Sequence, residues 1–126
     1  MNKKYEIGSI GEKAAADFIV KHDFKILETN YRKVYGEIDV VAEKDGVIHF
    51  IEVKTSKFYP DSAFLPEVRV NARKIRNLKK LCETYLREKR VSQDQPWQID
   101  VISVILNRDS VKGINFFENA VFERKY

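Results

Sequence analysis

The sequence predicts an α/β protein in which a β-hairpin lies between two amphipathic helices. The hairpin is GEIDVVAEKDGVIHFIEVKT, Gly36 to Thr55, where two apolar runs flank Asp45-Gly46. A type I′ turn needs positive φ at both central residues, which makes Asp-Gly a strong hairpin signal. Apolar residues recur at helical spacing before and after this stretch. A chain of 126 residues fits one domain with its own core, so we expect a single domain, 1–126.

The first helix is expected over Lys4–His22 because apolar residues such as Ile10 and Phe18 recur there at helical spacing. Gly8 and Gly11 interrupt its first turns, where each glycine costs about 1 kcal/mol relative to alanine. Either the helix begins later, or these small residues allow another segment to approach the backbone closely.

The remaining elements follow from the same periodicities. Pro66 suits a first helical turn, and an apolar stripe from Ile75 to Leu86 marks the buried side of the second helix. Aromatic residues in the loop before it either stack on bases or pack on the core, the second being the more common role. In order we expect a strand over Phe24–Arg32, the hairpin, a loop over Ser56–Leu65, a helix over Pro66–Arg90, a strand over Trp97–Leu106, a turn over Asn107–Gly113 and a strand over Ile114–Phe117.

The hairpin register places acidic residues opposite one another. If Asp45 and Gly46 are the turn, Asp39 lies across from Glu52, and Glu37 lies across from Lys54 on the same face. Facing carboxylates repel by roughly 0.2–1 kcal/mol, yet at that separation they can share one hard cation. The pattern therefore indicates a metal site, with a solvated face of mixed charge as the alternative.

The second helix carries a marked excess of positive charge, whereas exposed helix faces usually balance their signs. A surface that contacts nucleic-acid phosphates would explain the excess; a basic, solvated helix is the alternative. A net charge of +4 and a pI near 9.1 permit a polyanionic partner. The residues assigned to this surface are Arg69, Arg73, Lys74, Arg76 and Lys80.

Composition limits the location of the protein. No apolar run approaches the ~20 residues of a membrane span, and the N-terminus lacks a signal-peptide core. Cys82 is the one cysteine, and its apolar helical neighbours predict a small core residue. We therefore expect a cytoplasmic protein that has no membrane partner.

The chain resembles a known family at four short motifs. The order helix–strand–hairpin–helix–strand with Glu12, Asp39, Glu52 and Lys54 is similar to the PD-(D/E)XK nuclease superfamily. More closely, the motifs resemble those of the YraN-like family, small bacterial proteins that are similar to Holliday-junction resolvases. They are Gly8-x-x-Gly11-Glu12, Asn30-Tyr31-Arg32, Gly36-Glu37-Ile38-Asp39 and Glu52-Val53-Lys54-Thr55.

The resemblance implies a restriction-endonuclease-like mixed sheet flanked by helices, with the acidic cluster at one end. It implies that Asp39 and Glu52 bind Mg²⁺ or Mn²⁺ beside the backbone carbonyl of Val53, with Glu12 as an outer ligand. Lys54 would orient the attacking water and offset phosphate charge. Glu37 could pair with Lys54 and hold its ammonium in place.

Three functions follow as hypotheses. The first is a metal-dependent DNA endonuclease, with branched or junction DNA among the expected substrates and a homodimer among the expected assemblies. The second is a nucleic-acid-binding module whose nuclease-like site is idle. The third, an interaction module for protein partners, has no specific motif behind it. Asp100, the lone charge of its strand, is expected to be a hydrogen-bonded structural acid.

Overall fold

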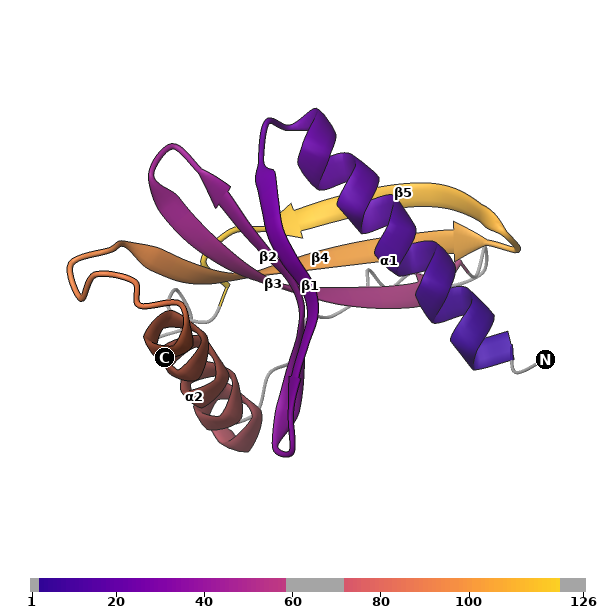
Figure 1. Ribbon diagram of the computed structural model, residues 1–126. Coiled ribbons are helices and arrows are strands. Elements are labelled where there is room, and N and C mark those ends of the chain that lie inside the picture. Colours follow the sequence, from indigo (N-terminus) through magenta and orange to yellow (C-terminus); the bar gives the residue numbers. More distant parts are fainter. Residues whose placement is uncertain (1–2, 59–71, 121–126) are drawn as a thin grey trace.

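The computed structural model describes residues 3–58 and 72–120 and places a five-stranded sheet between two helices (Figure 1). The strands lie in sequence order, and only the β3–β4 pair is parallel. The predicted α/β class, with a mixed sheet flanked by helices, is therefore confirmed. The elements are α1 (Lys3–Lys21), β1 (Lys25–Lys33), β2 (Gly36–Lys44), β3 (Val47–Lys57), α2 (Ala72–Glu88), β4 (Trp97–Asn107) and β5 (Ser110–Phe117).

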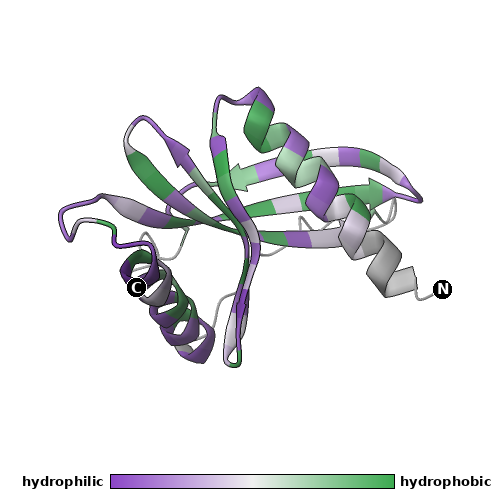
Figure 2. Ribbon diagram, viewed as in Figure 1, coloured by the Kyte–Doolittle hydropathy of each residue, from purple (hydrophilic) through white to green (hydrophobic). Residues whose placement is uncertain are grey.

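Each face of the sheet packs against one helix. Phe50 of β3 belongs to the core beneath α2, together with Leu81 and Tyr85. Its neighbour Ile51 points to the other face and packs with Ile19 of α1. This alternation is what a strand buried on both faces requires. Figure 2 shows the matching hydrophobic side of α2 turned toward the sheet.

The predicted hairpin register is confirmed. Asp45 and Gly46 have φ values of 51° and 80°, as a type I′ turn requires. Lys44 pairs with Val47, and the ladder continues residue by residue to Val40 and Ile51, where it ends. From there β3 continues beside β4 as far as Lys57, while β2 stays with β1.

Several predicted boundaries shift. The turn expected over 107–113 is shorter, because Asn107 pairs with Ser110 and β5 begins there. The turn consists of Arg108, which has a positive φ of 58°, and Asp109. The second helix ends at Glu88, and its expected first residues, 66–71, lie outside the described residues.

The loop predicted over 56–65 begins later, because Ser56 and Lys57 extend β3. Phe58 follows directly, donates its backbone N–H to Leu106, and has the Lys112 ammonium 4.1 Å above its ring. The ring of this aromatic residue thus contacts Lys112 of β5. Tyr59 to Leu65 lie outside the described residues.

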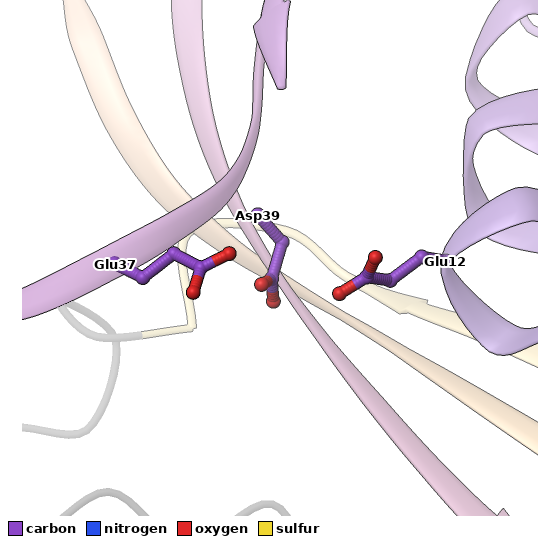
Figure 3. A group of neighbouring side chains, drawn as sticks. All are labelled: Glu12, Glu37 and Asp39. Carbon is purple, nitrogen blue, oxygen red and sulfur yellow. The ribbon is translucent and has the colours of Figure 1, made fainter. Parts of the chain in front are cut away.

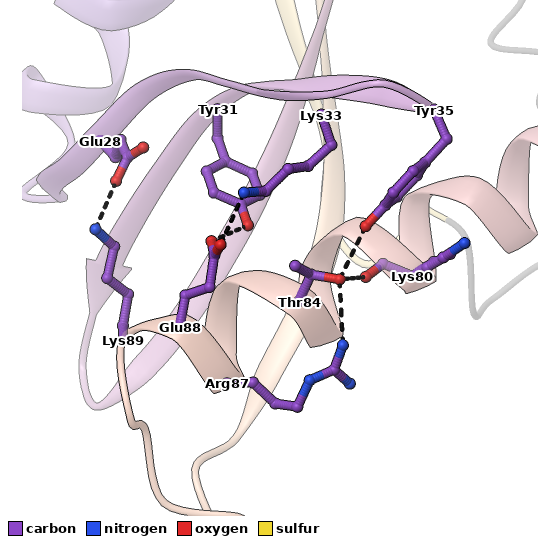
Figure 4. A network of polar contacts seen from close by, with 9 residues as sticks. All are labelled: Glu28, Tyr31, Lys33, Tyr35, Lys80, Thr84, Arg87, Glu88 and Lys89. Atoms are coloured by element: carbon purple, nitrogen blue, oxygen red, sulfur yellow. Dashed lines mark hydrogen bonds and ion pairs between the residues drawn. The ribbon is translucent and has the colours of Figure 1, made fainter.

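Polar contacts fix the β1–β2 hairpin to α2 (Figure 4). Glu88 accepts hydrogen bonds from the Tyr31 hydroxyl and, at 2.7 Å, from the Lys33 ammonium. The Tyr35 hydroxyl lies 2.9 Å from the Thr84 hydroxyl. Cys82 of the same helix is buried in the core between α2 and the sheet, which confirms its predicted core position. Within the described residues, neither helix has the length and apolar character of a membrane span.

Gly11 is where α1 approaches the sheet most closely. A Cβ atom built on Gly11 would lie 1.8 Å from the Thr55 Oγ1 atom and 2.9 Å from its Cβ, so only glycine fits. The close approach considered from the sequence is thus found at Gly11. A Cβ on Gly8 would meet nothing within 4 Å.

We predict opposite effects for alanine at these two glycines. Gly11→Ala should lower the free energy of unfolding by about 1–3 kcal/mol, because Thr55 or the helix must shift. Gly8→Ala should raise it by about 0.5–1 kcal/mol through helix propensity alone. Urea unfolding of both variants measures the difference. Equal stability of the two variants would contradict the close packing of α1 on β3.

Candidate metal centre

Asp39 bridges the point where β2 and β3 separate. The Asp39 side chain lies just beyond the last ladder pair, and its Oδ2 accepts a hydrogen bond from the backbone N–H of Val53 at 2.7 Å. In the confirmed register, Asp39 and Glu52 are the next pair after Val40 and Ile51. They are not a ladder pair, because the strands have begun to diverge there. The Asp39 carboxylate takes the place of the missing ladder contact.

Three carboxylates converge beside this point (Figure 3). Glu12 of α1 and Glu37 and Asp39 of β2 each place one oxygen so that all three atoms lie within 4.8 Å of one another. Such a set repels itself when it is charged and unshared. Carboxylate oxygens are the ligands that Mg²⁺ and related hard cations take in proteins. The arrangement suits a metal ion, and it includes the predicted outer acid Glu12.

Glu52 lies at the same point but is held differently. Its side chain is 14% exposed, and its Oε1 accepts ion pairs from Lys74 of α2 at 2.5 Å and from Lys54 at 3.4 Å. Its Oε2 is buried and has no hydrogen-bond partner among residues 3–58 and 72–120. A buried carboxylate oxygen without a donor is rare in proteins, and a cation is one way to satisfy it.

The electrostatics of Asp39 fit a cation site. The pKa of Asp39 is raised to about 6, mainly by burial and also by the negative charges of Glu12, Glu37 and Glu52, while the hydrogen bond from the Val53 N–H acts in the lowering direction. A bound cation would favour the ionised carboxylate and lower this pKa. The acids that raise the pKa are the candidate ligands themselves.

Two lysines share Glu52. Burial and the adjacent Lys74 lower the pKa of the Lys54 ammonium, which brings it closer to the neutral amine than an ordinary lysine. Burial lowers the pKa of the Lys74 ammonium as well, but its contact with the Glu52 carboxylate outweighs burial, so that the pKa of Lys74 is raised. Lys54 is therefore the lysine that gives up a proton more readily.

Glu37 does not pair with Lys54, the partner considered for it from the sequence, because Lys54 pairs with Glu52. Its carboxylate instead accepts hydrogen bonds from Asn30 at 2.8 Å and Arg32 at 3.0 Å, both on β1. These contacts orient the Glu37 side chain toward Asp39. They also give a structural role to two residues of the Asn30-Tyr31-Arg32 motif.

The residues assigned to nucleic acid divide into two groups. Arg73, Arg76 and Lys80 are exposed on α2, with the Lys80 ammonium 4.3 Å from the centroid of the Tyr35 ring. Lys74 is half-buried and reaches Glu52, a contact that the sequence did not reveal. Arg69 lies outside the described residues.

Asp100 lies on β4 beside Ile51, next to the strand that carries Glu52, but it has a different environment. It is fully buried, and its carboxylate accepts hydrogen bonds from His49 Nδ1, from the Gln98 amide and from the backbone N–H of Asn119. The prediction of a hydrogen-bonded structural acid is confirmed.

Comparisons with known proteins agree with the motifs. A model of the uncharacterised protein family UPF0102 matches residues 11–104. A UPF0102 protein of Caldicellulosiruptor bescii is 38% identical over 122 residues, covering 95% of this chain and 99% of its own. One from Alkaliphilus oremlandii is 39% identical over 123 residues, covering 95% and 99%. One from Clostridium botulinum is 39% identical over 116 residues, covering 91% and 93%.

The raised pKa of Asp39 predicts how stability changes with pH in the absence of metal. Between about pH 4 and 6 the unfolded Asp39 has lost its proton while the folded one keeps it. The folded state then binds more protons, so the free energy of unfolding falls as the pH rises through this window. Asp39→Asn, whose amide oxygen can still accept the Val53 N–H, should be more stable than wild type by about 1–3 kcal/mol near pH 8. The two proteins should converge near pH 4.

Urea unfolding of wild type and Asp39→Asn at pH 4 and pH 8, with a chelator present, measures this difference in stability. Repeating the measurement with Mn²⁺ tests whether Asp39 is a metal ligand. A cation at ten times its dissociation constant should stabilise wild type by about 1.4 kcal/mol and Asp39→Asn much less. An equal response of the two proteins would show that Asp39 is not a ligand.

Proposed function

Because the chain belongs to the uncharacterised protein family UPF0102, whose description names no activity, we propose from the site itself a metal-dependent DNA endonuclease. The observation that carries the proposal is the meeting of acids and lysines where two strands diverge. Glu12, Glu37 and Asp39 converge there, and beside them Glu52 has one buried oxygen without a donor. Metal-assisted hydrolysis of a phosphodiester uses cation ligands and a positive group near the reacting phosphate.

The proposed ligands are Asp39 and Glu52, with the Val53 carbonyl beside them and Glu12 as an outer ligand. Glu37 joins this set because the structure brings its carboxylate to Glu12 and Asp39. Mg²⁺ or Mn²⁺ suits these ligands, since such ions take a few carboxylates and keep several waters for substrate oxygens. When bound, the ion lowers the pKa of a water and offsets the charge that develops on the phosphate.

The protein's own residues position the reaction. The Val53 N–H fixes Asp39, and Asn30 and Arg32 fix Glu37, so the acids need no rearrangement. Lys54 orients the attacking water and, with its lowered pKa, can take a proton from it. Lys74 stabilises negative charge on the phosphate oxygens from the side of α2.

The resemblance to PD-(D/E)XK nucleases supports the same reaction. The order helix–strand–hairpin–helix–strand, on which that resemblance rests, matches the elements from α1 to β4, and the acids lie where β2 and β3 diverge. Similarity to Holliday-junction resolvases makes branched DNA a candidate substrate and a homodimer a candidate assembly. The exposed cations Arg73, Arg76 and Lys80 of α2 are proposed to contact its phosphates.

A nucleic-acid-binding module with an idle site is the second candidate. The ion pair of Lys74 and Glu52 favours it, because an ammonium 2.5 Å from a proposed ligand already neutralises that carboxylate. In this candidate the lysine replaces the cation, and the basic helix alone accounts for binding. The two candidates differ in whether a metal changes the protein's action on bound DNA.

We predict that Asp39→Ala, Glu52→Ala and Lys54→Ala each reduce metal-dependent cleavage at least about a hundredfold, as loss of one charge-stabilising group does. The assay compares linear, nicked, flapped and four-way DNA with Mg²⁺, with Mn²⁺ and with chelator. Glu43→Ala, an exposed acid of β2 outside the cluster, is the matched control and should cleave as wild type does.

Full activity of Glu52→Ala would contradict the proposed site. If wild type binds DNA and no metal supports cleavage of any substrate, the idle-site candidate holds. Circular dichroism of each variant separates lost chemistry from lost folding.

The basic helix is tested by salt dependence. Each phosphate contact contributes about 0.9 to the slope of log affinity against log salt. Arg73→Glu with Arg76→Glu should therefore reduce the magnitude of the slope by about 1.8 on duplex DNA. Arg108→Glu with Lys112→Glu, the same charge change at exposed residues of the β4–β5 turn and of β5, is the control. Equal slopes for the two double variants would assign Arg73 and Arg76 to a solvated face.

A further inference from the structure

A pocket lies on the α1 face of the sheet, at the end away from the acids. Its volume is about 460 Å³, within the range of small-molecule sites. The aromatic residues Phe18, Phe24 and Phe116 line it, with the rings of Phe24 and Phe116 stacked 5.8 Å apart between centroids. The proposed nuclease reaction uses none of these residues.

A buried histidine–aspartate pair forms part of its lining. His49 lines the pocket although only 6% of its side chain is exposed. Its Nδ1 lies 2.5 Å from the Oδ2 of Asp100, which is fully buried. A carboxylate can only accept a hydrogen bond, so Nδ1 carries the proton. In the neutral ring Nε2 is then the acceptor, and no hydrogen bond within the described residues uses it.

The other histidine of the chain lines the same pocket and is held in the same tautomer. His22 Nδ1 donates to the Phe18 carbonyl oxygen at 2.8 Å, and its ring stacks on the Phe18 ring with centroids 4.0 Å apart. Its Nε2 is likewise the free ring nitrogen. Two imidazoles with defined acceptor atoms therefore face a space with aromatic walls.

These walls and acceptors define the ligand chemistry. Stacked rings favour a planar aromatic ligand, and fixed imidazole acceptors favour one that carries N–H donors at its edge. The pocket's charged residues include both signs, Lys44 and Glu118 among them, so the ligand needs no net charge there. A nucleobase has each of these properties.

We propose that this pocket binds a nucleobase, which packs against its aromatic side chains and is hydrogen-bonded at its edge to His49 and His22. The base comes either from a free nucleotide or from an unpaired position of a strand. The inference is independent of the acidic centre, because it uses neither its residues nor a metal.

NMR spectroscopy of the two imidazole groups tests the proposal directly, because both histidines of the chain are in the pocket. Adenosine 5′-monophosphate, uridine 5′-monophosphate and unpaired oligonucleotides are titrated with chelator present. At least one base should shift both imidazole signals saturably below about 10 mM. Ribose 5-phosphate, which has no base, should not. Tighter binding of the oligonucleotide would identify a strand as the source, and tighter binding of the mononucleotide would identify the free ligand.

Two variants make the test specific. Val47→Phe fills the pocket from its edge and should weaken binding at least about tenfold, whereas Val111→Phe on exposed β5 should not. Asp39→Asn should bind as wild type, so failure of the nuclease proposal leaves this one intact. Equal shifts with ribose 5-phosphate, no saturable shift, or unchanged binding by Val47→Phe would each overturn it.

Discussion

The change of partners along β3 is the constraint on which the candidate centre depends. β3 pairs antiparallel with β2 only as far as Ile51, but it stays beside β4 to Lys57. Past Ile51, its edge toward β2 has backbone groups that need new partners. Asp39 supplies one by accepting the Val53 N–H. A carboxylate is thus fixed at this point by the backbone of the strand that also carries Glu52 and Lys54.

The two helices bring charge to this point from opposite faces of the sheet. On one face, Gly11 allows α1 to touch Thr55, and this contact sets the position of the next residue, Glu12. On the other face, α2 is held to β1 and β2 by Tyr31, Tyr35 and their partners, and its first turn delivers Lys74 to Glu52. Packing that stabilises the fold therefore also determines which side chains meet at the acids.

Local patterns predicted the hairpin and its acids well, because the Asp45-Gly46 turn determines the register of every following pair. The same reasoning placed Glu37 on the face of Asp39. It could not find the contact of Lys74 with Glu52, since the distance between a helix and a strand depends on packing and not on spacing. From spacing alone, Lys74 therefore looked like one more surface cation of a basic helix. The same reasoning placed the start of β5 too late, at Ile114, whereas β5 begins at Ser110, which pairs with Asn107.

Two buried carboxylates in neighbouring strands show what distinguishes a structural acid from a candidate ligand. Asp100 has a donor on both of its oxygens, so its burial is compensated and needs no cation. Glu52 has ammonium groups on one oxygen and, among residues 3–58 and 72–120, no donor on the other, while three acids including Glu52 raise the pKa of Asp39 beside it. Such an arrangement lowers stability unless something positive completes it. Lys74 and Lys54 complete it in part, and the unpaired Oε2 of Glu52 is where a cation would complete the rest.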